Sequence, residues 1–438
     1  MSNNENIEIN YLEVNGDIPV DIEQDVYISV NRETPLKVHS LGFQPAKSIP
    51  EIPRWFLQKY ANKSKDFIVL EPFSGGGTTI VETLNNGNSI YWMDNNPLSR
   101  LMGRVKSTQY SPEKVLEATK EILDKANKQV EVEHRIDFKN KDLWFQKPVQ
   151  EALEILRDNI SKADESVRDL LWLMYSVTVR KVSDMEDGMI LASRRSNNRE
   201  IPQYSRNDVY QYFELYINKA ISAIQEWNPI LNEKKGFSME LKNNDAKILA
   251  GEWTCDAIIT SPPYINAIDY IWASKFELHW LGFVADDSKR LELSLTEIGT
   301  ERIKAKEYKE LGQTGNERLD LLLKDIYLGT KYKASKGQNE LRSRVTYKYF
   351  NDMKEHFINS YKHLNKGGYY CFTIGDVSKI CGVDIPVADI LTEMAEEIGF
   401  TKIFQFNILL KNRRLNVPRN VKFAGVIKHD TTIVLQKN

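Results

Sequence analysis

Short apolar runs alternate along the chain with longer segments in which apolar residues recur every three or four positions. The runs at residues 67–70, 89–93 and 257–259 are rich in β-branched or aromatic residues and have the length of buried strands. The first run leads into helical spacing at residues 80–84. Because strands and helices alternate in this way, the pattern predicts a doubly wound α/β fold with a mostly parallel sheet.

Two long segments interrupt the strand pattern. Apolar stripes at helical spacing occupy residues 115–123, 152–156 and 170–174, and the next strand is predicted at residues 237–241. A second, charged and largely helical segment precedes the final strands. We therefore divide the chain into an acidic N-terminal segment (1–35), an α/β domain (36–104, 236–283 and 349–438), a helical insertion (105–235) and a charged helical insertion (284–348).

A glycine-rich loop lies between the first strand and its helix. Gly75, Gly76 and Gly77 let the backbone turn tightly there and let a ligand approach the N–H groups. Asp94 follows the second strand, where an acid suits the hydroxyls of a ribose. Nicotinamide-binding folds use the same geometry and are the alternative, although the G-x-G-x-x-G spacing is absent.

A second motif follows the strand at residues 257–259. In the run from Thr260 to Tyr264 (TSPPY), the two prolines fix φ and remove two backbone donors, so nearby carbonyls stay free to accept hydrogen bonds. Ser261 adds an acceptor and the Tyr264 ring a flat stacking surface, which together suit the exocyclic amino group of an extruded base. A Pro-Pro turn that closes a strand is the alternative interpretation.

Together these residues resemble the amino-group DNA methyltransferases, which use S-adenosylmethionine. Residues 71–79 (EPFSGGGTT) look like the cofactor loop of that family, usually written D-P-F-x-G-x-G-T-T. Residues 94–97 (DNNP) look like its second motif and residues 260–264 like its catalytic motif. Glu71 stands where Asp is usual, which keeps the charge but lengthens the reach by one methylene. The resemblance implies a Rossmann-like methyltransferase sheet.

The resemblance extends from about residue 39 to the end of the chain, with two long interruptions. Residues 43–53 (FQPAKSIPEIP) resemble the segment that closes over the methionine end of the cofactor. Residues 364–370 and 431–435 resemble the last strands of the same sheet. Asp245 matches the family's third motif, which reaches the adenine amino group of the cofactor; a turn Asp that caps its own backbone is the alternative.

The resemblance implies a full set of site residues. The catalytic residues are Ser261, Pro262, Pro263 and Tyr264. The residues that bind S-adenosylmethionine are Phe43, Pro45, Lys47, Glu71, Pro72, Phe73, Ser74, Gly75, Gly77, Thr78, Thr79, Asp94, Asn95, Asp245 and Ser261. A serine in the first position of the catalytic motif is met more often in cytosine-N4 enzymes, which favours cytosine N4 over adenine N6. The same motifs would also fit an RNA amino-group methyltransferase or a nucleic-acid-binding relative that has lost catalysis.

Charge is unevenly distributed in a chain whose net charge is −2. Residues 1–31 contain acids but no Lys or Arg, whereas basic residues gather in three later clusters. Such clusters can be solvated faces, but beside a base-handling motif they suggest phosphate contacts. The predicted DNA-binding residues are Arg194, Arg195, Arg199, Arg342, Arg344, Arg413 and Arg414. We expect double-stranded DNA in a cleft between residues 105–235 and 284–348 and, by resemblance, a cognate restriction endonuclease as a partner.

Composition excludes several classes of protein. No run of eighteen apolar residues occurs and the N-terminus is acidic and polar, so we expect a cytoplasmic protein without a membrane span or signal peptide. Cys255, Cys371 and Cys381 are scattered without C-x-x-C spacing, so we expect neither a metal site nor a disulfide framework.

Several aromatic residues follow the TSPPY motif at near-helical spacing. Tyr270, Trp272, Phe276 and Trp280 form a stripe that usually indicates core packing, although Tyr270 is also a candidate for the base pocket. We expect His279 to be a partly buried structural histidine.

Overall fold

The structure is a computed structural model that describes residues 11–61, 66–194, 201–265, 268–303, 310–409 and 429–438. Nine strands of these residues form one sheet in the order β1-β2-β10-β11-β7-β6-β3-β4-β5. The strands are β1 (Leu12–Asn15), β2 (Tyr27–Asn31), β3 (Ile68–Glu71), β4 (Ser89–Trp92), β5 (Ser238–Glu240), β6 (Cys255–Thr260), β7 (Leu364–Gly375), β10 (Phe400–Leu409) and β11 (His429–Lys437). A separate hairpin joins β8 (Val377–Ile380) to β9 (Val383–Pro386).

The sheet is mostly parallel. Strands β5, β4, β3, β6 and β7 pair in parallel, and β11 is antiparallel to both of its neighbours, β7 and β10. The predicted α/β class and the Rossmann-like arrangement are therefore confirmed. Because β3 and β6 are adjacent and parallel, the loops that follow them meet at the same edge of the sheet.

Side chains that alternate along the strands supply two cores on opposite faces of the sheet. Val69 and Ala257 belong to one core, whereas their chain neighbours Leu70 and Ile258 belong to the other. The first core is covered by α1 (Glu51–Tyr60), α2 (Thr78–Asn85) and α3 (Pro97–Ser107). The second is covered by α13 (Gln338–His363) and α14 (Val387–Ile398), and α12 (Glu317–Leu328) packs on α13.

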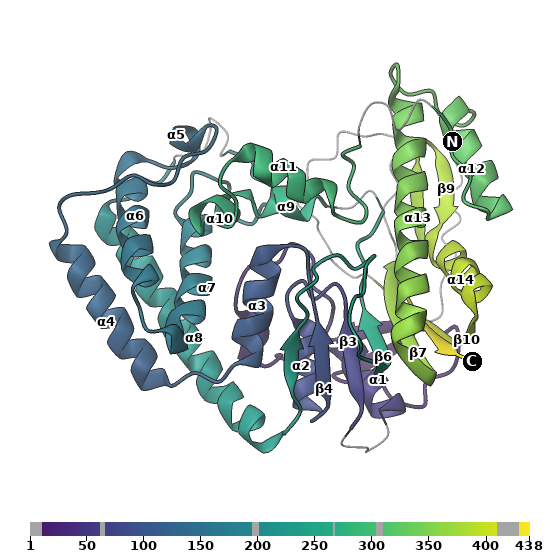
Figure 1. Cartoon of the computed structure of the whole chain (residues 1–438), viewed down its shortest axis with the longest axis horizontal. Helices are drawn as coiled ribbons and strands as arrows, with labels where there is room; N and C mark the ends of the chain where they lie inside the picture. The colour runs from purple at the N-terminus through teal and green to yellow at the C-terminus, as the bar shows by residue number, and fades with distance from the viewer. Residues whose placement is uncertain (1–10, 62–65, 195–200, 266–267, 304–309, 410–428) are drawn as a thin grey trace.

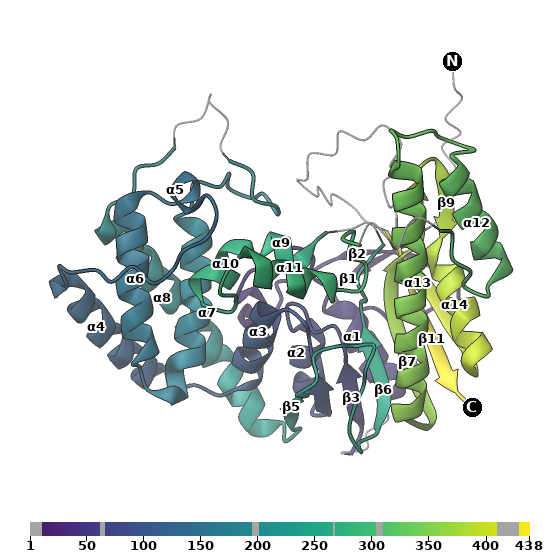
Figure 2. The ribbon, with the colours of Figure 1, turned by 45° about the horizontal axis from the view of Figure 1, so that its top comes forward.

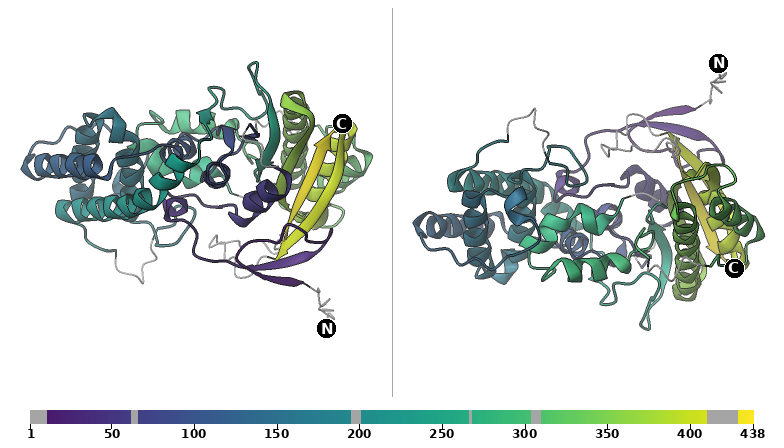
Figure 3. Two further views of the ribbon diagram at one scale, coloured as in Figure 1. Left: turned by 90° about the horizontal axis from the view of Figure 1, so that it is seen from below. Right: turned by 90° about the horizontal axis from the view of Figure 1, so that it is seen from above.

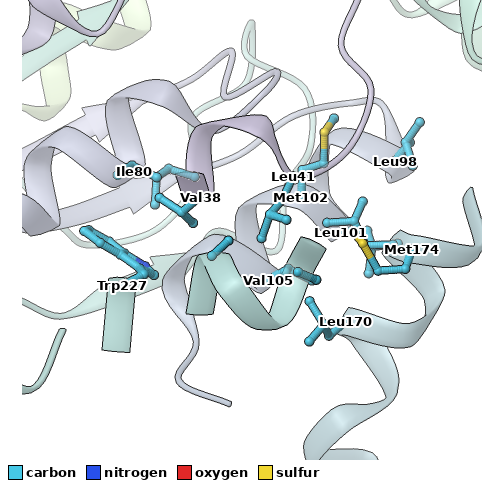
Figure 4. Close-up of a cluster of buried hydrophobic side chains, with 14 of the residues drawn as sticks. Val38, Leu41, Ile80, Leu98, Leu101, Met102, Val105, Leu170, Met174 and Trp227 are labelled. Carbon is cyan, nitrogen blue, oxygen red and sulfur yellow. The ribbon is translucent and has the colours of Figure 1, made fainter. Parts of the chain in front are cut away.

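The first insertion is a helical body beside the sheet (Figure 1). Its helices are α4 (Pro112–Lys128), α5 (Lys141–Trp144), α6 (Lys147–Ser161), α7 (Glu165–Lys181) and α8 (Arg206–Glu233). As expected from Ser111-Pro112, α4 begins at the proline, and the Ser111 side chain accepts a hydrogen bond from the Lys114 N–H. Figure 4 shows α2, α3 and the 3-10 helix η1 (Lys37–Ser40) sharing one hydrophobic cluster with Leu170, Met174 and Trp227 of this body.

Three short helices, two before the second insertion and one at its start, lie between the helical body and the tall α13 (Figure 2). These are α9 (Tyr270–Ala273), α10 (Lys275–Trp280) and α11 (Asp287–Leu295). Phe276 and Trp280 are buried, as predicted for the aromatic stripe, while Tyr270 and Trp272 are half-buried. His279 is buried rather than partly buried, and it stacks on Phe138 with ring centroids 4.7 Å apart, as in a packed core.

The structure corrects three predicted boundaries. The division at residue 348 falls inside α13, which is one continuous helix from Gln338 to His363, and the division at residue 104 falls inside α3. The acidic N-terminal segment is not separate from the sheet, since β2 pairs with β10 and β1 with β2 (Figure 3). These strands of four and five residues have too little apolar periodicity to stand out in the sequence.

Within the described part of the chain, no helix is long and apolar enough to cross a membrane, and no group of three His, Cys, Asp or Glu side chains is arranged to hold a metal ion. Cys255, Cys371 and Cys381 are buried and free.

Candidate active site

The two sequence motifs lie side by side at the carboxyl ends of β3 and β6. In the parallel register Leu70 pairs with Ile258, which places the residues after each strand next to one another. Thr260 Oγ1 donates a hydrogen bond to Glu71 Oε1 across the two strands at 2.5 Å. The glycine loop and the TSPPY motif therefore form one site, which the sequence could only suggest.

Glu71 joins three parts of this site. Besides Thr260, it accepts hydrogen bonds from Thr79 Oγ1 at 2.6 Å and from the Phe73 N–H at 3.0 Å. Its side chain is buried, and burial raises its pKa to about 7 despite the three donors. These contacts fix the glycine loop to strand β6. Of the two acids at the loop, Glu71 and Asp94, only Asp94 has a partly exposed side chain.

The glycine loop is a tight turn that depends on its glycines. Gly75 and Gly77 have φ values of 47° and 75°, a region that favours glycine. The Gly77 N–H donates to the Ser74 carbonyl at 2.6 Å, and a Cβ on Gly77 would lie 3.2 Å from Cδ of Lys106. A side chain at Gly77 would therefore strain the turn and crowd the helix beneath it.

Asp94 is held at the mouth of this loop. Its two carboxylate oxygens accept the N–H groups of Gly75 and Asn96, each at 2.8 Å. Burial raises the pKa of Asp94 to about 6, with the two backbone donors opposing the rise. The carboxylate is half-buried, so it is oriented by the loop and still presents surface to a ligand.

The TSPPY motif forms a partly exposed ledge at the end of β6. Ser261 Oγ donates its hydrogen to the Thr373 carbonyl at 3.2 Å, so the oxygen lone pairs remain available to accept. Pro262 is buried, while Ser261, Pro263 and Tyr264 are half-buried. A Cβ on Gly299 would lie 3.5 Å from the Tyr264 carbonyl oxygen, so the second insertion packs closely against the ledge.

The segment that contains Phe43, Pro45 and Lys47 lies against the glycine loop. A Cβ on Gly76 would meet Gln44 Cβ at 3.4 Å and Lys47 Cγ at 3.6 Å. The Arg180 guanidinium of the helical body lies 3.6 Å from the Phe43 ring centroid. Residues far apart in sequence are thus brought to the loop, as the resemblance implied.

Asp245 occupies a turn, with β5 ending at Glu240. Its Oδ1 accepts the Lys247 N–H at 3.0 Å and lies 3.2 Å from Lys247 Nζ. Asp245 therefore caps its own backbone in a turn, while its contact with the cofactor stays a prediction. Lys247 Nζ and Asn95 Nδ2 both donate to Thr296, at 3.4 Å each, which sets the second insertion over this edge of the site.

Sequence reasoning missed one buried histidine of the site. His356 of α13 lies against the Phe73 ring, with centroids 5.0 Å apart. Its Nδ1 faces the Ala246 carbonyl at 2.8 Å and must donate, so Nε2 accepts from the Tyr370 hydroxyl at 2.7 Å. Burial lowers the pKa of His356 to about 4, which keeps the ring neutral. Only its position on the apolar face of a long helix could have indicated it.

Exposure separates the predicted site residues into two groups. Phe43, Pro45, Phe73, Gly75, Asp94, Asn95 and Asp245 are half-buried and Lys47 is exposed, while Glu71, Pro72, Ser74, Gly77, Thr78 and Thr79 are buried. Among the predicted DNA-binding residues, Arg194 is exposed and Arg342 pairs with Glu301 at 2.5 Å. Arg344 lies 4.7 Å over the Tyr347 ring. Arg195, Arg199, Arg413 and Arg414 lie outside the described residues.

The chain is similar in sequence to several known proteins. No family model matches the chain. The Type II methyltransferase M.MvaI of Kocuria varians is 20% identical over 419 residues, which cover 89% of this chain and 88% of that protein. The Type II methyltransferase M.BsoBI of Geobacillus stearothermophilus is 24% identical over 85% of this chain and 81% of its own.

Another relative matches a shorter part of the chain at a higher sequence identity. The Type II methyltransferase M.AvaI of Anabaena variabilis is 33% identical over 152 residues, which cover 33% of this chain and 30% of that protein. These findings confirm the resemblance that the motifs carry, and the chain is a relative of the Type II methyltransferases along most of its length.

Proposed function

We propose that this protein is a site-specific DNA methyltransferase that transfers a methyl group from S-adenosylmethionine to the exocyclic amino group of an extruded base, with cytosine N4 as the target. The observation that carries the proposal is half-buried Ser261, whose hydroxyl donates its hydrogen to the Thr373 carbonyl and so keeps its lone pairs free to accept. The glycine loop and Asp94 lie beside it.

The residues around the glycine loop fit an adenosyl cofactor. Asp94 is oriented to accept ribose hydroxyls, and the loop presents backbone at close range. Phe73 is half-buried beside the loop and Lys47 is exposed above it, so both can contact the ligand. When bound, S-adenosylmethionine supplies an electrophilic methyl group with a good leaving group.

The ledge makes the amino group of the base a better nucleophile. An amino group on a base is a poor nucleophile because its lone pair is delocalised into the ring. Ser261 Oγ and the Pro262 carbonyl accept the two amino hydrogens, which turns the nitrogen toward tetrahedral geometry and frees the lone pair. Tyr264 stacks on the base, a contact worth about 1–3 kcal/mol in other base–aromatic stacks. Positioning then carries much of the rate enhancement.

DNA is the substrate that the relatives and the charge pattern support. The relatives are named as Type II methyltransferases, a class tied to restriction–modification, so we also propose a cognate restriction endonuclease as partner. Exposed Arg194 on the helical body, with Arg342 and Arg344 on α13, would contact phosphates from two sides of the ledge. These two elements lie on opposite sides of the sheet edge (Figure 2).

Asp94 gives the sharpest test of the cofactor. Asp94→Ala is expected to weaken S-adenosylmethionine binding by about 1–3 kcal/mol, the scale of a hydrogen bond to a charged group. Because the pKa of Asp94 is about 6, affinity in the wild type should weaken as the pH falls through that value, since protonation removes the charge. Calorimetric titration between about pH 5 and pH 8 measures this change.

The controls separate Asp94 from other acids. Asp94→Asn should lack the pH step, and any remaining slope belongs to Glu71, whose pKa lies near 7. Asp256→Asn is the matched control, because Asp256 accepts the Ile68 N–H at 2.9 Å at the opposite end of the same strands. Tight binding of NAD with none of S-adenosylmethionine would overturn the cofactor assignment.

The identity of the methylated nucleoside shows which atom receives the methyl group. Genomic DNA incubated with the enzyme and digested to nucleosides is expected to contain N4-methylcytosine, identified by mass spectrometry. N6-methyladenine as the sole methylated base would replace cytosine with adenine as the target, while leaving the ledge and the cofactor loop in their proposed roles.

A further inference from the structure

Lys106 is a buried cation beneath the glycine loop that the proposed chemistry does not use. It lies in the last turn of α3 with no side-chain exposure, and no carboxylate among the described residues forms an ion pair with it. Burial, together with the nearby Lys47 ammonium, holds the pKa of Lys106 well below its usual range. Burying an ammonium without an acid is costly, so its presence needs a reason.

The contacts of Lys106 are two backbone carbonyls that flank the cofactor site. Its Nζ donates to the Gly76 carbonyl at 2.6 Å and to the His39 carbonyl at 3.3 Å. Gly76 is the middle glycine of the loop, and His39 lies in η1, four residues before Phe43. Lys47 Nζ donates to the same His39 carbonyl at 3.1 Å, so two lysines converge on one oxygen.

Apolar side chains make up part of the surroundings of Lys106, and the His39 ring, which is hydrogen-bonded to Glu82 at 2.8 Å, and the Lys47 ammonium lie near enough to interact with its charge. Val38, Ile80, Val105 and Trp227 belong to the hydrophobic cluster at this place (Figure 4). The Trp227 indole N–H donates to the Lys106 carbonyl, at 2.8 Å. An unbranched apolar side chain of similar length would suit this cluster without the cost of burying an amine. Stability therefore does not explain the lysine, whereas its two donor contacts to the loop and to η1 do.

We propose that Lys106 is a positioning residue of the cofactor site, which holds the Gly76 peptide and the end of η1 at a fixed separation so that the glycine loop and residues 43–47 close on the same ligand. The inference rests on the proposed function and deepens it. Lys106 touches neither the cofactor nor the base in this role, and it acts through the two carbonyls.

The test is Lys106→Met, which keeps the length and removes the donors. We expect the dissociation constant and the KM for S-adenosylmethionine to rise at least about tenfold, the scale of losing a hydrogen bond to a charged group. The kcat at saturating cofactor should stay within about threefold, because the ledge is untouched. The melting temperature should change little, since the gain from removing a buried amine offsets the carbonyl left without its donor.

Lys437→Met is the matched control. Lys437 is half-buried and also donates to two backbone carbonyls, those of Tyr361 and Leu364 at 2.6 and 2.8 Å, but it lies at the other end of the sheet, in the last strand. This variant should lose stability without a change in cofactor affinity. Lys106→Gln retains one donor and should give an intermediate affinity.

The possible outcomes distinguish a failure of the proposed function from a failure of the positioning role of Lys106. If the wild-type protein does not bind S-adenosylmethionine, the proposed function fails whatever Lys106 does. If the wild type binds and Lys106→Met binds equally well, the positioning role alone is wrong. If Lys106→Met and Lys106→Gln instead lose melting temperature, kcat and affinity together, Lys106 is a structural residue and the proposal is overturned.

Discussion

Replacing Ser261 with alanine is expected to slow methyl transfer about 10- to 100-fold, a larger effect than the accompanying loss of cofactor affinity. The Ser261 hydroxyl donates to the Thr373 carbonyl, which leaves its lone pairs for an amino hydrogen of the base. That hydrogen bond strengthens as the nitrogen becomes positive, so its loss falls on the transition state. Single-turnover transfer of a labelled methyl group at saturating cofactor measures the effect.

The Ser261→Asn variant tests whether another hydrogen-bond acceptor can replace the serine hydroxyl. An Asn side chain also offers an oxygen that accepts a hydrogen bond from an amino group, so this variant should retain more activity than Ser261→Ala. Equal rates for the wild type and Ser261→Ala would show that the hydroxyl does not hold the amino group. The ledge would then act through its shape alone.

Glu71→Ala is expected to lower the free energy of unfolding by about 2–4 kcal/mol and to weaken both cofactor binding and turnover. The change leaves the buried donors Thr79 Oγ1, Thr260 Oγ1 and the Phe73 N–H without their common acceptor. Since these donors belong to the loop, the ledge strand and the helix after the loop, their relative positions should loosen. Chemical denaturation followed by fluorescence measures the loss of stability.

The pH dependence of stability distinguishes charge from packing at this position. Burial raises the pKa of Glu71 from 4.5 to about 7, so the carboxyl takes up a proton on folding between these values. Its contribution to stability is therefore full below about pH 4.5 and declines as the pH rises to about 7. Glu71→Gln should lack that decline. Wild-type stability in the Glu71→Ala variant would contradict a linking role for this side chain.

The parts of the fold that could be predicted are those with a local signal. The runs that became β3, β4 and β6 are apolar and β-branched or aromatic, and Ser111-Pro112 marks a helix start that needs no tertiary contact. Strands β1 and β2 were not predicted, because β2 joins the sheet by pairing with β10, whose residues lie nearly four hundred positions later, and β1 pairs with β2. Periodicity also could not place the start of α13, because a charged insertion and a long helix share the same spacing.

The candidate site divides in the same way. The glycine loop, Asp94 and the Ser261 ledge are contiguous motifs, so their chemistry is visible in the residues themselves. Their partners are not, since the link from Thr260 to Glu71 spans 189 positions and depends on the parallel register. Lys106 and His356 look like ordinary helical residues until the fold places them under the loop and against Phe73. Asp245 is the opposite case: it matches a family motif in the sequence, but in the structure its carboxylate accepts a hydrogen bond within its own turn.

The most direct test of the proposed function is methyl transfer by the purified wild-type protein. S-adenosylmethionine with a labelled methyl group is incubated with the protein and either duplex DNA or RNA of the same sequences, and Ser261→Ala serves as the slowed reference. We predict label in DNA that depends on sequence, little label in RNA, and a strong loss with Ser261→Ala. Label in RNA but not in DNA, or in neither while S-adenosylmethionine still binds, would contradict the proposed function.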